Sequence, residues 1–252
     1  MQWTGALASR TKLHHTLPPL GPLRGLKQSG IHFSIPWHIR FIESLMAQVK
    51  KAEIRDRILA AAGELFTEHG YARATINQIA KAAGIAPSNV YVYFESKLKI
   101  MFAIYEPWFR GHLERLEQEV ADLPTPEAKV FRIVQKLWRD IPADRNAFSN
   151  NIIQAISAAT PEDRYDPALL HWTEQKIAGL LSSALPPKRA ANVDCVRLAH
   201  VLMMAFDGFA VNYRINRAIS CDNGVIEQMC AGILGAFSRS SLRIRRKRTT
   251  RR

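Results

Sequence analysis

Cysteine is scarce in this sequence. The chain of 252 residues has three cysteines, Cys195, Cys221 and Cys230, and they show neither a CxxC spacing nor a cysteine–histidine ligand pattern. An odd number of scattered cysteines argues against a disulfide framework and against a zinc site, and it fits a reducing cytoplasm. We therefore expect inert thiols that pack between helices, and no bound metal.

Catalytic fingerprints are also missing. The sequence contains no GxSxG, HExxH, P-loop or dinucleotide-binding motif, and no Ser/His/Asp grouping can be assigned from spacing. We therefore expect a protein that is not an enzyme and that needs no cofactor.

The sequence has no long uninterrupted apolar run. The most apolar stretch, Leu198–Val211, is short and is interrupted by His200, Asp207 and Gly208. The N-terminus lacks the continuous apolar segment of a secretory signal. We expect a cytoplasmic protein that does not bind a membrane.

Positive charge is abundant but unevenly placed. The formal net charge is +13, and residues 239–252 hold eight lysines and arginines and no acid. Residues 1–45 add five basic residues and one acid, so residues 46–238 are nearly neutral. Charge alone therefore does not identify a DNA-binding core. The basic tail could add salt-dependent affinity for nucleic acid, or it could have no role.

The N-terminal stretch predicts no regular structure. Prolines and glycines are frequent in residues 1–45, and apolar residues there follow neither a helical nor an alternating spacing. We expect residues 1–48 to be a disordered extension. Met46 directly precedes the first predicted helix, so translation from Met46 is a further expectation, which the intact mass of the native protein would test.

Helical periodicity begins near Lys50 and continues to the tail. The first helix should end at Gly70, short helices should follow over 76–82 and 87–93, and another should start after Ser96 and kink or break at Pro107. Beyond residue 123, a capping residue stands beside proline in Thr125-Pro126, Thr160-Pro161 and Asp166-Pro167, which predicts three further helix starts. No stretch is typical of a strand, so the predicted fold class is all-α.

The stretch 75–97 predicts a helix-turn-helix. Thr75 and Gln78 have the spacing of a capping box, and Gly84 stands where a sharp turn between helices needs a positive φ. The second helix then carries short polar and aromatic side chains suited to a DNA major groove.

Residues 50–101 resemble the DNA-binding domain of the TetR/AcrR family of transcriptional regulators. The resemblance implies a three-helix DNA-binding domain, and a larger helical domain that dimerises and binds a small-molecule effector. We assign these to residues 49–106 and 107–238, with a disordered basic tail over 239–252. The residues that carry the resemblance are Ile58-Leu59-Ala60-Ala61-Ala62, Leu65-Phe66, Gly70-Tyr71, Thr75-Ile76, Ile79-Ala80, Ala83-Gly84-Ile85, Val90-Tyr91, Tyr93-Phe94 and Ser96-Lys97.

The recognition helix departs from the family pattern at Ala86, Pro87 and Val92, and it has no basic residue of its own. The usual arginine fork onto guanine is therefore absent from it. Ser88 and Asn89 remain as hydrogen-bonding readers and Val92 could contact a thymine methyl group, so we expect an A·T-rich site. The DNA-binding residues that the resemblance implies are Thr75, Pro87, Ser88, Asn89, Tyr91, Val92, Tyr93 and Lys97, with Thr75, Tyr91, Tyr93 and Lys97 on phosphates.

The last two predicted helices, within 193–215 and 225–237, are apolar on more than one face. Such helices need partners on both sides, so we expect a four-helix interface between two copies, although a fully monomeric core is the alternative. The predicted interface residues are Val201, Phe209, Ile226, Met229, Ile233 and Phe237.

An effector pocket should lie among the helices between 125 and 210. Its predicted lining residues are Trp108, His112, Trp138, Asn151, Gln154, His171, Trp172, Gln175 and Asp207. The sequence thus favours a homodimeric repressor that leaves double-stranded DNA when a small-molecule effector binds. The alternative is an architectural nucleic-acid-binding protein that acts through its basic tails with little sequence preference.

Overall fold

The computed structural model describes residues 37–215 and 221–235. The predictions for residues 1–36, for the basic tail and for Phe237 therefore lie outside the described residues. Within these ranges every regular element is a helix, which confirms the all-α fold class with a helix-turn-helix ahead of a larger helical part. The chain divides into the units Met1–Leu45 and Met46–Arg252, and the site lies within the second.

The first helix begins earlier than predicted. Helix α1 spans Trp37–His69 rather than starting near Lys50. The physical reason is that residues 37–49 contain neither glycine nor proline, so nothing in the sequence stops a helix once Pro36 is passed. Gly70 adopts a φ of 79° directly after α1 and ends it as predicted.

Helix α2 (Ile76–Ala83) begins with the predicted capping box. The Gln78 amide N–H donates to Thr75 Oγ1 over 3.2 Å, and the Thr75 amide N–H donates to Gln78 Oε1 over 2.9 Å. Gly84 then adopts a φ of 68°, which a residue with a Cβ rarely adopts, and the chain turns into the next helix. These contacts fix where the turn begins and ends.

The second helix of the pair is shorter than predicted. Helix α3 spans Pro87–Val90 and does not reach Tyr93. The amides of Val92 and Tyr93 donate instead to the carbonyls of Asn89 and Val90 three residues back, over 3.2 and 3.0 Å. Alternating valine and tyrosine after Asn89 have modest helix propensity, which favours this tighter turn.

Proline does not break the next helix. Helix α4 runs from Lys97 to Ala121 with Pro107 inside it, and Ser96 caps its start by accepting from the Lys99 amide. Pro107 removes one backbone donor. Buried side chains on both sides of it, including Tyr105 and Phe109, keep the helix packed against its neighbours, so the predicted break is wrong.

The remaining elements complete a helical bundle. Thr125 caps α5 as predicted, with its Oγ1 accepting from the Ala128 amide. Thr160-Pro161 starts only a single 3₁₀ turn instead of a helix, because Asp163 closes a capping box onto Thr160 and Arg164 then takes a left-handed conformation. The elements are α5 (Pro126–Gln135), the π-helical η1 (Lys136–Asp140), α6 (Phe148–Ser157), η2 (Pro161–Asp163), α7 (Ala168–Ala184), α8 (Pro187–Ala190), α9 (Cys195–Ile215) and α10 (Asn223–Leu234).

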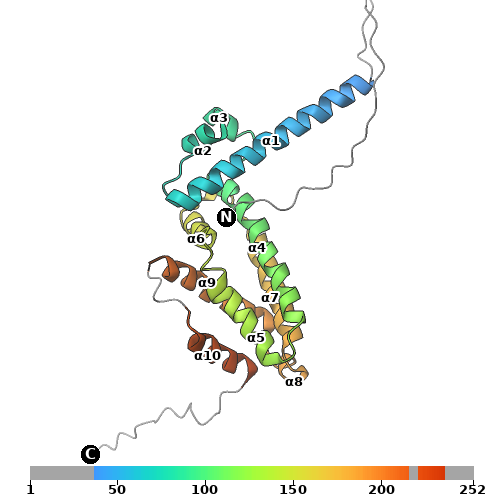
Figure 1. The fold of residues 1–252 in the computed structure, drawn as a ribbon, viewed down its shortest axis with the longest axis vertical. Coiled ribbons are helices and arrows are strands. Elements are labelled where there is room, and N and C mark those ends of the chain that lie inside the picture. The colour runs from blue at the N-terminus through green and yellow to red at the C-terminus, as the bar shows by residue number, and fades with distance from the viewer. Residues whose placement is uncertain (1–36, 216–220, 236–252) are drawn as a thin grey trace, which may run out of the picture. The chain divides into compact units, whose positions relative to one another are not determined.

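Helix α9 contacts three other elements of this bundle. It packs against α6, α7 and η1, while α4 packs against α5, α6 and α7 (Figure 1). Trp138 of η1 donates from its Nε1 to the Leu202 carbonyl of α9 over 3.0 Å. By length and composition α9 could cross a bilayer, but a core helix of a soluble protein passes the same test, so this is weak evidence for a span.

Candidate nucleic-acid interface and ligand cavity

The helix-turn-helix presents an exposed face and buries the opposite one. Val90 is completely buried, whereas Ser88, Asn89 and Pro87 are exposed. Tyr91 and Val92 keep 57% and 66% of their surface exposed, a large fraction for apolar and aromatic side chains. The contact of these residues with DNA stays a prediction, and this geometry leaves them free to make it.

Two of the predicted phosphate ligands already have partners inside the domain. Lys97 donates from its Nζ to the carbonyls of Tyr71 and Ala74 over 2.9 and 3.0 Å, and its ammonium lies 4.1 Å from the centre of the Tyr71 ring. Burial lowers the pKa of Lys97. The Thr75 hydroxyl serves the capping box. Lys97 thus fastens α4 to the turn before α2, and a phosphate contact from it stays a prediction.

Positive charge reaches the recognition segment from α1. Lys51 and Arg55 line a shallow groove together with Val92 and Tyr93. The Arg55 guanidinium lies 5.1 Å from the centre of the Phe94 ring. Sequence reasoning missed both cations, although their spacing of four residues on an exposed helix face was a usable signal. The charge that α3 lacks is therefore present beside it.

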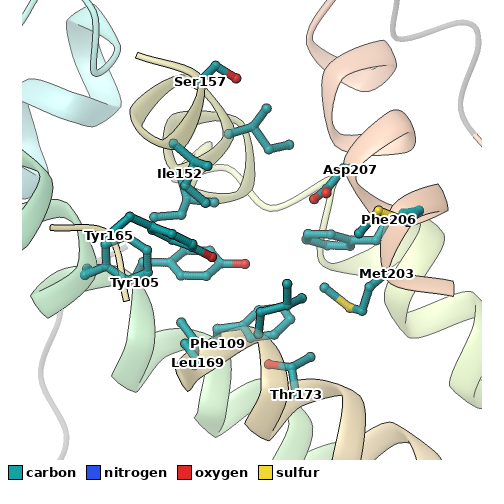
Figure 2. Close-up of a pocket in the computed structure, with 15 residues that line it drawn as sticks. Tyr105, Phe109, Ile152, Ser157, Tyr165, Leu169, Thr173, Met203, Phe206 and Asp207 are labelled. Carbon is teal, nitrogen blue, oxygen red and sulfur yellow. The ribbon is translucent and has the colours of Figure 1, made fainter. Parts of the chain in front are cut away.

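A cavity of about 250 Å³ opens between α4, α6, α7 and α9. Figure 2 shows that aromatic and aliphatic side chains from these helices surround it, together with Tyr165 from the segment before α7. Its volume exceeds the 150 Å³ that suffices for a benzene ring in an engineered protein cavity. The lining residues are Phe102, Tyr105, Phe109, Ile152, Ile153, Ile156, Ser157, Tyr165, Leu169, Leu170, Thr173, Met203, Met204, Phe206 and Asp207.

One carboxylate lies in this apolar lining. Asp207 of α9 faces the cavity opposite Tyr105 and Tyr165 (Figure 2). Burial raises its pKa to about 6. Burial also raises the pKa of Tyr105, with a smaller contribution from the Asp207 charge, and the pKa of Tyr165, with smaller contributions from the charges of Asp166 and Asp207. The cavity therefore combines ring faces, two phenol groups and one acid.

The structure places most of the predicted pocket residues elsewhere. Asp207 lines the cavity, whereas the other eight do not. Trp138 serves the core through its bond to α9, and Gln175 lines a separate groove of α4 and α7. His112 packs edge-on against Trp108, and burial lowers its pKa to about 4. Of these eight residues Trp138 and Asn151 are buried, four are half-buried and two are exposed, whereas phenylalanine, tyrosine, isoleucine, leucine and methionine side chains make up most of the cavity lining. The eight residues are Trp108, His112, Trp138, Asn151, Gln154, His171, Trp172 and Gln175.

Asn151 ties the cavity wall to the DNA-binding domain. Its side chain is 1% exposed, its Nδ2 donates to the Phe66 carbonyl and its Oδ1 accepts from the Tyr71 amide, both over 2.9 Å. Gln154 adds a longer contact of 3.4 Å from the Ala72 amide. The neighbouring residues Ile152 and Ile153 of the same helix line the cavity. Helix α6 therefore touches the cavity and the helix-turn-helix at once.

The predicted interface residues fall into three groups. Val201 of α9 is 52% exposed, and Phe209 and Met229 are half-buried. Ile226 and Ile233 are buried inside their own chain and leave almost no surface for a partner. They face inward because α10 packs on α5, which sequence periodicity alone did not reveal.

The match to a known protein family runs from within α1 to the start of α4. Residues 58–104 match the family of bacterial regulatory proteins of the tetR type. This part of the chain is therefore similar to proteins of that family. The fatty acid metabolism regulator of Bacillus subtilis is 29% identical over 90 residues, and the HTH-type regulator HbdR of Aromatoleum is 30% identical over 95. These matches cover 36% and 38% of this chain, and the chain spans less than half the length of either relative, 46% and 42%.

Two solved structures are similar in fold to most of this chain. FadR from Bacillus subtilis in complex with stearoyl-CoA aligns with a TM-score of 0.52 and 18% identity, over 72% of this chain and 98% of that one. A transcriptional regulator from Saccharomonospora viridis in complex with choline aligns with a TM-score of 0.51 and 20% identity, over 73% and 96%. At these identities the likeness concerns the fold alone.

Replacing Asn151 tests the tie between α6 and the DNA-binding domain. Asn151→Ala removes both hydrogen bonds and leaves the buried Tyr71 amide without its acceptor, so we expect a loss of about 1–3 kcal/mol in the free energy of unfolding. Urea denaturation measures it. Gln154→Ala is the matched control and should change the midpoint much less, since its contact is long and exposed. Equal effects of the two changes would contradict the role given to Asn151.

The raised pKa of Asp207 predicts a pH dependence of stability. Because the folded state holds the proton up to about pH 6 and an unfolded aspartate releases it near 3.8, Asp207 favours folding at low pH and loses this contribution as the pH rises through 6. Asp207→Asn should therefore gain melting temperature relative to the parent chain between pH 4.5 and 7.5. Asp166→Asn, outside the cavity, is the control. A constant difference across this range would refute the assignment.

Proposed function

We propose that this protein is a homodimeric, sequence-specific DNA-binding transcriptional regulator of the cytoplasm. It acts as a repressor that a small molecule in the α4–α6–α7–α9 cavity releases from its operator. The observation that carries the proposal is the double contact of α6, which lines this cavity and also hydrogen-bonds to the helix-turn-helix through Asn151. Two structural neighbours whose complexes hold stearoyl-CoA and choline support a cavity that accepts small molecules.

The proposed release is a shift between two conformers. A ligand that fills the cavity presses on Ile152 and Ile153, which belong to the ten-residue helix α6 together with Asn151. A displacement of α6 therefore moves Asn151, and with it the end of α1 and the turn that leads into α2. The two recognition segments of a dimer then no longer match successive major grooves.

DNA recognition combines readers on α3 with cations on α1. Asn89 and Ser88 lie exposed where they can meet base edges, and Lys51 and Arg55 lie beside Val92 where they can meet phosphates. Exposed apolar side chains on α9, among them Val201, supply a surface for the second copy.

The test of DNA recognition is binding-site selection from genomic fragments followed by anisotropy titration of the selected site. We expect an A·T-rich half-site repeated about one helical turn away. Asn89→Ala should weaken this site about 10-fold or more and leave unrelated DNA unaffected, because a good base contact contributes 1–3 kcal/mol. Asn192→Ala, on the loop after α8, is the matched control.

Two outcomes would count against this recognition. Selection that returns no common sequence, with a steep fall of affinity in salt, would support the architectural alternative that acts through the basic tails. Contact positions restricted to G·C pairs would reject the A·T expectation while leaving a sequence-specific regulator.

The proposed dimer predicts the effect of charge on α9. Val201→Asp places a carboxylate in the expected interface, so we expect the mass measured by light scattering to fall from that of two chains to that of one at micromolar concentration. Val92→Asp adds the same charge to an exposed valine of the helix-turn-helix and should leave the dimer intact. A dimer that survives Val201→Asp would place the interface elsewhere.

A further inference from the structure

We propose that the cavity between α4, α6, α7 and α9 is selective for apolar cations, and that the Asp207 carboxylate binds the ammonium group of such a ligand. This inference rests on the proposed function, because it names the ligand class of the same cavity. It goes beyond that function in predicting which charge the effector carries.

The cavity lining has one charged side chain, and its charge is negative. Among the residues that line the cavity, Asp207 is the one acid, and lysine, arginine and histidine are absent. Asp207 is half-buried in this apolar lining, where a carboxylate loses part of its hydration, and a ligand cation would offset that loss. Burial raises the pKa of Asp207 only to about 6, so the group is largely ionised at neutral pH and can form an ion pair there.

Aromatic rings in the lining could also contact a ligand cation. Tyr105 and Phe109 stack with ring centres 5.2 Å apart, and Phe206 lies 5.8 Å from Phe109. Ring faces attract cations, and they pack equally well against an aliphatic or aromatic ligand body. The Tyr105 and Tyr165 hydroxyls face the same space as Asp207, so they can orient the polar end of a ligand (Figure 2).

Basic residues lie in a neighbouring groove and not in the cavity lining. Arg55 and Lys99 line an adjacent groove that shares Phe102, Tyr165 and Leu169 with the cavity. The Lys99 Nζ donates to the Arg164 carbonyl over 3.3 Å, and that groove also holds Glu106 and Asp166. A carboxylate ligand that reaches into the cavity would therefore meet Asp207 without a cation in the lining to offset the repulsion.

The size of the cavity limits the ligand. A volume of about 250 Å³ is more than one and a half times the 150 Å³ that holds benzene, which corresponds to roughly ten non-hydrogen atoms. Three probes of similar shape differ only in their polar end: 4-phenylbutylamine, 4-phenylbutanol and 4-phenylbutyrate. They are a cation, a neutral donor and an anion at pH 7.5.

Calorimetric titration of the full-length protein with these probes, without DNA, tests the inference. We expect the amine to bind at least 10-fold more tightly than the alcohol, because a hydrogen bond to a charged partner contributes about 1.5–3 kcal/mol. The butyrate should bind more weakly than both. Asp207→Asn should reduce the affinity for the amine to that for the alcohol, and Asp166→Asn, one groove away, should leave the order of the three probes unchanged.

The result that would overturn the inference is equal binding of amine and alcohol, or a preference for the amine that survives Asp207→Asn. The comparison of the three probes on the parent chain decides the matter even where the variant fails to fold. Release of DNA, followed by anisotropy with the same probes, separates this inference from the proposed function. Binding of the amine without release would reject the proposed function, whereas release by the butyrate or alcohol alone would reject only the selectivity for cations.

Discussion

The pair of hydrogen bonds made by Asn151 is the constraint on which the rest of the molecule depends. One amide side chain satisfies the Tyr71 N–H and binds the Phe66 carbonyl, and both backbone groups belong to the DNA-binding domain. The amide is buried, so water cannot replace either bond. A shift of α6 that keeps these bonds would therefore also move the end of α1.

The cavity owes its chemistry to the same arrangement. Asn151 and Gln154 are turned toward the helix-turn-helix, and α6 lines the cavity with three isoleucines and Ser157. The other polar groups of the lining come from Tyr105 of α4, Thr173 of α7, Asp207 of α9 and Tyr165 before α7. The division of α6 into a polar face and an apolar face thus determines what kind of molecule the cavity can hold.

Local signals in the sequence predicted several helix caps and one sharp turn. The capping box of Thr75, the turn at Gly84 and the caps at Ser96 and Thr125 all formed as expected, because each depends on residues three or four positions apart. The cavity was less predictable, since it depends on which faces of four distant helices meet. Asn151 and Gln154 were expected in the pocket, whereas tertiary packing gave them to the opposite face. Pro107 was expected to break α4, but burial of its neighbours outweighed the lost hydrogen bond.

The bonds of Lys97 also bear on how salt affects this protein. Its ammonium binds the carbonyl oxygens of Tyr71 and Ala74 and a ring face, without a carboxylate, in a partly buried position. Dissolved ions screen such short, sheltered contacts far less than they screen exposed charges on phosphates. The geometry of the helix-turn-helix should thus persist at ionic strengths that remove it from DNA. The slope of the logarithm of DNA affinity against the logarithm of salt concentration would then reflect the number of phosphates contacted. Unfolding of the helix-turn-helix would not contribute to it.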